Sequence, residues 1–472
     1  MRAAPSFVPC VVDGDAESSV DTGSDVVASF ARDPAPWSPS FASVVVSDAW
    51  ASSKAAEASF EALARSTDMA RRAVARARVR EPPQTCARDM ALDGDAFVAS
   101  EDDMRAERAA FLKIVRAVYA YPDDVARDVA RWRASLDSAH IPAHHRPLLA
   151  NAVRELDRAE ACAEANTAFT RAAIDNFVHN PYAPEHLRVP KEEVERWSKE
   201  AETFRAAKDD VDKVRYVLKN AYRDWSSDGA VERDAVYGLI FDALRAKFNV
   251  NVDVGSPDGE APRVLAPGCG LGRLVFELAR QGYDVQGNEF SYFMLFFSSF
   301  MLNATRDVGE FGIHPFMHAR SNHRRMEDAW RETRVPDVVP GDVTFPPGAS
   351  MSMSAGDFTA VYGTTAERGQ WDAVVTAYFI DTAHNVCEYL ECVANCLRTG
   401  GVWVNFGPLL YHWEEYHDEL SVELSLDDVI AAAESFGLRV EKCEFHDAMY
   451  TSDERSFHKT TYSCAFIVAV KE

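Results

Sequence analysis

A glycine-rich turn between a short apolar run and a helical pattern constrains the fold of this chain more than any other feature. Residues 263–289 read RVLAPGCGLGRLVFELARQGYDVQGNE, and the turn after the β-run 263–266 holds Gly268, Gly270 and Gly272. Glycines let the backbone approach a ligand without Cβ clashes, and the start of the following helix offers free N–H groups. The stretch therefore predicts a nucleotide-binding turn at the edge of a sheet.

Short β-rich runs alternate with helical patterns on both sides of residue 300, which is typical of a doubly wound α/β sheet. The seven runs are residues 263–266, 283–287, 350–354, 371–378, 401–406, 438–445 and 461–470. The last two follow each other without a helix, so we expect an antiparallel pair at that end of the sheet. Residues 305–348 form an irregular insert that is too long for a plain connector.

The chain before residue 260 has a different organisation. Residues 1–45 lack periodicity and predict a disordered leader, and residues 46–99 predict an appended helical segment. Residues 100–250 carry repeated 3.6-residue patterns, which predict an all-helical region. Two of these patterns are separated by Pro122 and Pro142. The α/β domain is expected to span residues 260–472.

Composition excludes several classes of function. The 472 residues include 50 Lys and Arg against 74 Asp and Glu, and the formal charge of −24 would repel a phosphate backbone or an anionic membrane. We therefore expect neither nucleic acid nor membrane as a partner. The nine Cys contain no CxxC pair, so no metal site is predicted. A cytoplasmic or nuclear protein is expected, and a homodimer is compatible with the sequence.

The spacing of the glycines distinguishes between nucleotide cofactors. A dinucleotide fingerprint GxGxxG that starts at Gly268 requires glycine at position 273, where this chain has Arg273. The GxGxG pattern favours S-adenosylmethionine instead. Glu289 ends the second β-run, where a carboxylate can accept hydrogen bonds from both ribose hydroxyls. The alternative for Glu289 is a solvated loop residue.

Two residues after the third β-run complete the predicted cofactor site. Asp357 follows Gly356 at the end of the strand and can accept a hydrogen bond from an adenine amino group, while Phe358 can cover the ring. The alternative is an Asx turn followed by a buried Phe. The glycine turn, the ribose acid and the adenine acid occur in the order that a class I methyltransferase requires.

The fourth β-run ends in the polar stretch FIDTAHN, residues 379–385. Asn385 and Glu388 predict an N-cap and capping box for the next helix, and Thr382 and His384 can support that turn. No cap requires Asp381, which lies at the carboxyl edge of the sheet, where open α/β folds place their chemistry.

The fifth β-run is followed by His412 in an apolar neighbourhood, GPLLYHW. A histidine in such surroundings is often a satisfied core residue. His412 lies beyond the strand next to Asp381, so a catalytic role is as well supported as a structural one.

Several stretches resemble the carnosine N-methyltransferases, also called the N2227-like family. They are DKVRYVLKNAYRDWSSDG, LAPGCGLGRLVFELARQGYDVQGNEFSYFMLF, SNHRR, SMSAGDF, YFIDTAHNV, GGVWVNFGPLLYHW and ELSVELS. The resemblance extends from about residue 100 to the C-terminus. It implies methyl transfer from S-adenosylmethionine to an imidazole nitrogen of a histidine-containing dipeptide, with carnosine giving anserine.

The resemblance also implies roles for single residues. The implied cofactor-binding residues are Asn220, Arg223, Gly268, Gly270, Gly272, Glu289, Asp357, Phe358 and Ala377, so that the N-terminal helical region contributes to the cofactor site. The implied acceptor-binding and catalytic residues are Asp381, His412 and Tyr462, with Tyr450 as a further substrate-binding residue. The family usually has Gln where this chain has Asn220, whose side chain is shorter.

Asp381 has the most specific implied role. It would accept the imidazole N–H, fix the tautomer that presents a lone pair to the methyl group, and offset the positive charge that develops on the ring. Two alternatives stay open: another imidazole acceptor such as a peptide or protein histidine, and a non-catalytic protein that binds the cofactor.

A basic cluster, Arg320, His323, Arg324 and Arg325, stands out in this acidic chain. Its simplest interpretation is a solvated or ion-paired loop. The sharper hypothesis is that one of its arginines binds the dipeptide carboxylate or closes the insert over the substrate.

Overall fold

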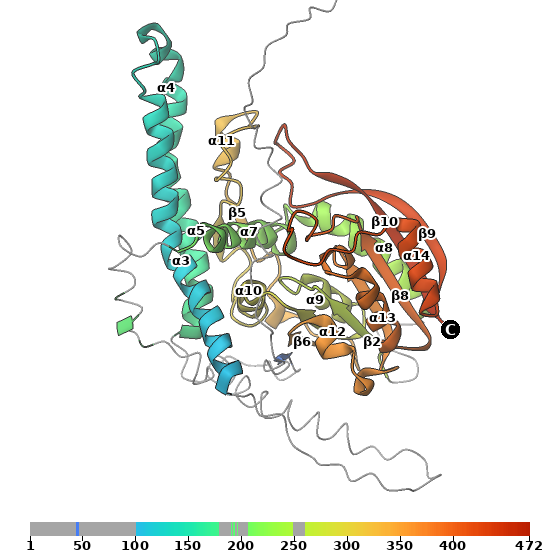
Figure 1. Ribbon diagram of the computed structural model, residues 1–472. Helices are drawn as coiled ribbons and strands as arrows, with labels where there is room; N and C mark the ends of the chain where they lie inside the picture. Colours follow the sequence, from blue (N-terminus) through green and yellow to red (C-terminus); the bar gives the residue numbers. More distant parts are fainter. Residues whose placement is uncertain are drawn as a thin grey trace, which may run out of the picture.

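Long helices of the N-terminal region stand beside an α/β body (Figure 1). The computed structural model describes residues 44–46, 101–178, 190, 192, 193, 196, 206–248 and 260–472. The predicted leader and appended helical segment lie outside the described residues, apart from residues 44–46, so both stay predictions. No helix in these ranges is long and apolar enough to cross a membrane.

The N-terminal helical region is confirmed, but one of its helices is longer than the sequence pattern indicated. Its elements are α3 (Glu101–Leu136), η2 (Ala143–His145), α4 (Arg146–Glu155), η3 (Leu156–Arg158), α5 (Ala159–Val178), α7 (Lys208–Trp225) and α8 (Ala230–Lys247). Helix α3 continues through Pro122, where we expected a break. Val118, Tyr121 and Val125 form one buried stripe across the proline. Burial of this stripe offsets the backbone hydrogen bond that Pro122 cannot make.

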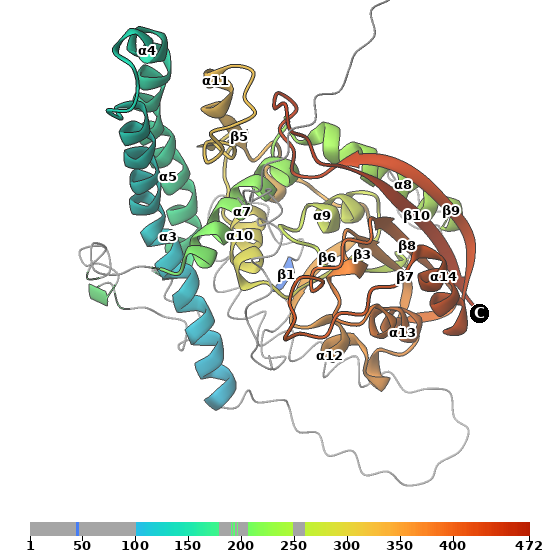
Figure 2. The ribbon, with the colours of Figure 1, turned by 45° about the horizontal axis from the view of Figure 1, so that its top comes forward.

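An eight-stranded sheet forms the centre of the α/β body. Its strands are β1 (Val44–Val46), β2 (Arg263–Pro267), β3 (Asp284–Glu289), β6 (Ser350–Ala355), β7 (Trp371–Ala377), β8 (Leu397–Gly407), β9 (Leu438–Met449) and β10 (Thr461–Lys471). Their order is β1-β6-β3-β2-β7-β8-β10-β9. All seven predicted runs form strands, and β9 and β10 pair antiparallel as expected. Strand β1 extends the sheet by pairing antiparallel with β6 (Figure 2).

Helices cover both faces of the sheet. One face carries α8, α9 (Arg273–Arg280) and α10 (Tyr292–Asn303), and the other carries α12 (Phe358–Tyr362), η6 (Thr365–Glu367), η7 (Ile380–Thr382), α13 (Val386–Cys396) and α14 (Leu426–Ser435). Side chains of β7 alternate between the faces, because Ala373 and Val375 belong to one core cluster and Val374 to the other. Helices α3, α5 and α7 pack outside α10 (Figure 1).

The predicted insert, residues 305–348, forms a small unit of its own. It contains the antiparallel pair β4 (Phe311–Ile313) and β5 (Thr333–Val335), α11 (Met326–Ala329) and η5 (Pro340–Asp342). Asp337 ties it to the helices: its carboxylate accepts from Arg233 Nη2 at 2.8 Å and from Arg273 Nη1 at 2.6 Å. The Asp337 backbone N–H donates to the carbonyl of Trp225 at 2.9 Å. The insert thereby holds α7, α8 and α9 together.

Candidate active site

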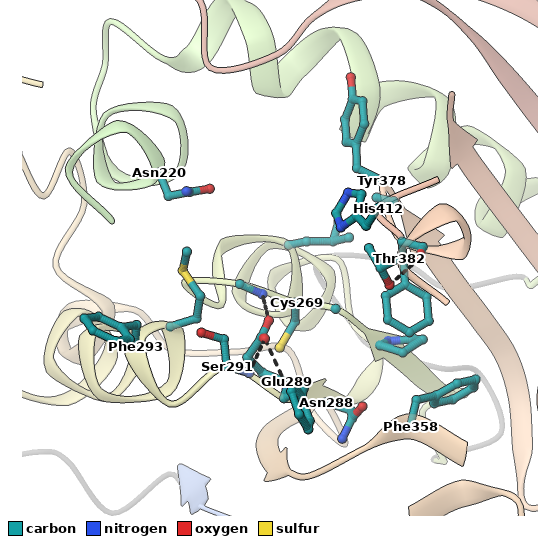
Figure 3. A pocket seen from close by; sticks show the side chains of 18 of the residues that line it. Asn220, Cys269, Asn288, Glu289, Ser291, Phe293, Phe358, Tyr378, Thr382 and His412 are labelled. Atoms are coloured by element: carbon teal, nitrogen blue, oxygen red, sulfur yellow. Dashed lines mark hydrogen bonds between the residues drawn. The ribbon is translucent and has the colours of Figure 1, made fainter. Parts of the chain in front are cut away.

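A cavity of about 810 Å³ lies at the carboxyl ends of β2, β3 and β7, and α3, α7, α8, α10, α12 and α13 also contribute to its walls. Asn220 lies on one side of the cavity and His412 with Tyr378 on the other (Figure 3). The predicted residues that line it are Asn220, Arg223, Gly268, Gly270, Glu289, Asp357, Phe358, Ala377, His412 and Tyr450. Gly272, Asp381 and Tyr462 belong to the same region but not to the cavity wall.

The glycine turn has the backbone conformation that its sequence predicts. Gly268, Gly270 and Gly272 have φ of +67°, +55° and +80°, a region in which side-chain-bearing residues are strained. Gly268 and Gly270 line the cavity. Gly272 instead begins α9 and faces α10, where an added Cβ would lie 2.9 Å from Leu302 Cδ1 and from Ser298 Oγ. Gly272 therefore permits close packing of two helices, and the first two glycines shape the cavity.

Glu289 lies at the end of β3 with its carboxylate held by backbone amides. Oε2 accepts from Gly270 N at 2.8 Å, and Oε1 accepts from Phe290 N at 3.0 Å and Ser291 N at 2.8 Å (Figure 3). Burial raises its pKa, and these three N–H groups act in the opposite direction. The side chain is 9% exposed, so Glu289 is an oriented carboxylate of the cavity and not a solvated loop residue.

Asp357 combines the two roles that its sequence context left open. Its Oδ1 accepts from Ala360 N at 2.9 Å and from Thr359 Oγ1 at 2.7 Å, which makes it the N-cap of α12. Both bonds end on the same oxygen, and Asp357 also lines the cavity, so the cap is compatible with a ligand contact. Phe358 is 2% exposed, and its ring lies edge-on to Phe379 at 5.5 Å. Its ring is thus fixed by core packing.

Helix α7 brings a polar face to the cavity. Asn220 is buried and donates to the carbonyl of Tyr216 at 2.9 Å, and Arg223 Nε donates to Asp224 Oδ1 at 2.7 Å. Lys213 and Tyr216, which were not predicted, line the same cavity. Together with Asn220 and Arg223 they repeat every three or four residues, so the helical period alone could have identified them.

Three tyrosines, Tyr378, Tyr450 and Tyr462, lie together at the cavity, and the first two line it. The Tyr450 ring lies 4.8 Å from that of Tyr378 and 6.5 Å from that of Tyr462. The hydroxyls of Tyr450 and Tyr216 are 2.8 Å apart. Tyr378 has φ of +53°, an uncommon backbone conformation that turns the chain directly after Ala377, the last residue of β7. The Tyr462 side chain is half-buried behind Tyr450.

Asp381 lies in η7, between Phe379 and Thr382, which line the cavity, but does not itself line it. It is 4% exposed, and its Oδ2 accepts from Leu410 N at 2.9 Å. No structural partner of Asp381 was predicted, but this bond joins η7 to the loop after β8. The His412 N–H, which donates to the Asp381 carbonyl at 3.0 Å, makes a second such connection. Burial raises the pKa of Asp381 to about 7, against the effect of the Leu410 N–H.

His412 lines the cavity beside Tyr378 (Figure 3). Burial lowers its pKa to about 4, so the ring is neutral at physiological pH. A neutral imidazole offers one N–H and one lone pair to a ligand. It adds no positive charge to this side of the cavity.

The polar residues after Asp381 build the start of α13. Asn385 is the N-cap and its Oδ1 accepts from Cys387 N at 3.1 Å, as predicted. The predicted capping box differs in detail, because Glu388 accepts from the Asn385 side-chain amide at 3.1 Å. His384 stacks on Trp413 with ring centroids 3.6 Å apart, and its Nδ1 lies 2.8 Å from the Leu420 carbonyl oxygen.

The basic cluster of the insert lies away from the cavity wall. The Arg320 guanidinium lies 4.9 Å from the ring centroid of Trp132, and that of Arg324 lies 5.9 Å from Phe457. His323 pairs as an isolated bridge with Ser456, so the cluster joins the insert to the β9–β10 loop. This placement argues against the hypothesis that one of its arginines binds a dipeptide carboxylate in the cavity.

The fold and this site define the class of the protein. Strands β6, β3, β2, β7 and β8 run parallel, and β10 lies antiparallel between β8 and β9. A glycine turn follows the central strand β2, and an acidic residue ends the neighbouring β3. These are the features of a class I methyltransferase.

Comparison with known proteins gives the family. The family model described as carnosine N-methyltransferase matches residues 200–472. Carnosine N-methyltransferase of Rattus norvegicus is 37% identical over 374 residues, which are 79% of this chain and 88% of the rat protein. The Schizosaccharomyces pombe protein of the same name is 36% identical over 325 residues, 66% of this chain and 81% of the yeast protein. The chain belongs to the carnosine N-methyltransferase family and is an S-adenosylmethionine-dependent methyltransferase.

Replacement of Gly268 by Ala tests the turn. The new Cβ would lie 2.3 Å from Phe379 Cδ2, at a φ that side-chain-bearing residues rarely adopt. We expect the affinity for S-adenosylmethionine to fall by about tenfold or more and the unfolding free energy to fall by about 1–3 kcal/mol. Calorimetric titration and thermal unfolding measure the two effects. Gly238→Ala on α8, where a Cβ meets nothing within 4 Å, is the control: it should leave the affinity unchanged and raise the unfolding free energy by about 0.5–1 kcal/mol, because Ala is favoured over Gly inside a helix.

Proposed function

We propose that this protein transfers a methyl group from S-adenosylmethionine to an imidazole nitrogen of carnosine, giving anserine and S-adenosylhomocysteine. One observation carries the proposal: a single cavity joins the glycine turn and Glu289 to the wall that holds His412 and Tyr378, and the His412 N–H of that wall donates to the Asp381 carbonyl at 3.0 Å. Membership of the carnosine N-methyltransferase family supports carnosine as the acceptor.

The residues on the donor side fit S-adenosylmethionine. Gly268 and Gly270 leave room for close backbone approach, and Glu289 presents an oriented carboxylate to ribose hydroxyls. Asp357 would accept from the adenine amino group, and Arg223 would contact the cofactor from α7. When bound, S-adenosylmethionine supplies an electrophilic methyl group.

The residues on the acceptor side would select one form of the imidazole. A neutral imidazole has one N–H and one lone pair, and only the nitrogen with the lone pair can attack a methyl group. Asp381 would accept the N–H of the other nitrogen, and Tyr462 would pack beside it. The ring would therefore enter between His412 and Tyr378 to reach Asp381. Such positioning can lower the activation free energy by on the order of 7–11 kcal/mol.

Asp381 would also take up the proton that methylation makes acidic. The methylated ring is a cation, and loss of its remaining N–H proton gives neutral product. A carboxylate whose pKa is about 7 can accept that proton near neutral pH and offsets the positive charge beforehand. Neutral His412 would hold the ring without repelling it.

The direct test uses purified protein with labelled S-adenosylmethionine and carnosine, followed by mass spectrometry of the product. We expect one methyl group on the imidazole. Transfer to a histidine-containing peptide but not to carnosine would favour the alternative acceptor. Cofactor binding without transfer to any imidazole would contradict the proposal.

We expect kcat at saturating substrates to rise with pH and to level off above about pH 7. The pKa of Asp381 is raised, so its ionised form, which accepts the N–H, predominates only above that value. One pH unit below the pKa, kcat should be lower by about tenfold. Measuring kcat instead of kcat/KM leaves out the titration of free carnosine. A kcat that stays constant from pH 5.5 to 8 would contradict the role of Asp381.

A further inference from the structure

One of the carboxylates that line the cavity has a different environment from the others. They are Asp224, Glu232, Glu289, Asp357 and Glu388. Asp224 pairs with Arg223, Glu289 accepts three backbone N–H groups, and Asp357 caps α12. Glu388 is exposed to solvent. These four have cationic, backbone or water partners that account for their charge.

Glu232, in the first turn of α8, is 6% exposed, and Arg223 acts on its carboxylate from a longer distance than a salt bridge. Its Oε1 accepts from Thr451 N at 2.7 Å. Within the described ranges of the chain, no Lys or Arg nitrogen lies within 4.0 Å of its carboxylate. A buried carboxylate without a cation in direct contact is costly unless a ligand supplies one. Burial raises the pKa of Glu232, and Arg223 and the N–H groups of Thr451 and Ser452 act in the opposite direction.

Glu232 belongs to the acceptor side of the cavity. Thr451, whose N–H it binds, directly follows Tyr450, and the Tyr450 ring packs on Tyr378 at 4.8 Å. Tyr378 and His412 both line the cavity, on the same side in the view of Figure 3. A ligand whose imidazole is held near His412 can therefore extend along the tyrosines toward Glu232.

We propose that Glu232 binds the terminal ammonium group of the dipeptide acceptor and makes the enzyme selective for a free amino group. The inference rests on the proposed function, because carnosine carries both an imidazole and a primary ammonium. The ammonium would supply a cation in direct contact and donate to the oxygen sites that the backbone N–H groups leave open. The cofactor also carries an ammonium group, so the test must separate the two sources.

The variant Glu232→Gln removes the charge but keeps an oxygen for the Thr451 N–H, so the β9–β10 loop stays in place. We expect KM for carnosine to rise by about 10- to 100-fold, which corresponds to the loss of a buried charge-assisted hydrogen bond. Neither kcat nor the Kd of S-adenosylmethionine should change by more than about twofold. Glu434→Gln on α14, exposed and outside the cavity, is the matched control.

A second acceptor tests the selectivity itself. N-propionylhistidine is carnosine with the amino group replaced by hydrogen. The unmodified enzyme should prefer carnosine by about 10- to 100-fold in kcat/KM, and Glu232→Gln should reduce this ratio to about one. An unmodified enzyme without that preference overturns the inference, as does a variant that keeps it.

The remaining outcomes show whether Glu232 binds the ammonium group of the dipeptide or that of the cofactor. They also show whether the inference fails alone or together with the proposed function. A variant that loses only affinity for S-adenosylmethionine assigns Glu232 to the cofactor and overturns the inference. Transfer to neither acceptor by the unmodified enzyme overturns the proposed function and the inference together. An active enzyme whose preference does not depend on Glu232 overturns the inference alone.

Discussion

Replacing Asp381 by Asn is expected to lower kcat for carnosine by about 10²–10³-fold while making the folded protein more stable at pH 8. The activity falls because an amide cannot accept the proton of the methylated ring or offset its charge. The stability rises because the pKa of Asp381 is raised from 3.8 to about 7 on folding, so the ionised side chain opposes folding. That cost is absent below pH 3.8, grows up to about pH 7 and is constant above it.

About three pKa units correspond to about 4 kcal/mol of unfolding free energy at pH 8, and the Asn variant should recover part of it. The Asn side chain keeps an oxygen for the Leu410 N–H, whereas Asp381→Ala loses that acceptor and should gain less. Denaturant unfolding at pH 8 and pH 4 measures the difference. Equal stability of the Asn variant and the unmodified protein at pH 8, together with unchanged kcat, would contradict both assignments.

The sheet was predictable because its signals are local. Each β-run has its own apolar pattern, and the residues that form the turn at Gly268 follow one another in the sequence. The continuation of α3 through Pro122 was not predictable from the sequence. It depends on the burial of Tyr121 and its neighbours against other helices. Strand β1 was missed for a similar reason: three valines form a strand only where the free edge of β6 accepts them.

The residues of the candidate site also fall into those that local sequence could predict and those that it could not. Glu289 and Asp357 were found because each ends a strand, and strand ends meet at one edge of the sheet. The partner of Asp381 could not be found, because Leu410 lies 29 residues further along the chain. Glu232 left no signal, since its significance depends on a cavity formed by elements distant in sequence. Only the three-dimensional structure shows that no cation of the described residues lies within salt-bridge distance of it.

The replacement Asp337→Ala is expected to destabilise the protein by about 3–5 kcal/mol. Asp337 accepts hydrogen bonds from Arg233 and Arg273, whose side chains are 4% and 7% exposed. Without it, the partners of Arg233 among the described residues are the carbonyls of Arg223 and Ser226, and two buried cations lose their shared counter-charge. Urea unfolding at pH 7 measures the loss.

Two variants show whether the destabilisation comes from loss of the Asp337 charge or from truncation of its side chain. Asp337→Asn keeps hydrogen-bond acceptors without the charge and should lie between Ala and the unmodified protein. Asp342→Ala removes an exposed carboxylate from the same insert and should stay within about 0.5 kcal/mol. Because the Arg223 carbonyl is one of the partners of Arg233, loss of Asp337 should also weaken binding of S-adenosylmethionine through α7. An Ala variant as stable as the Asp342 control would show that the insert does not hold α7, α8 and α9 together.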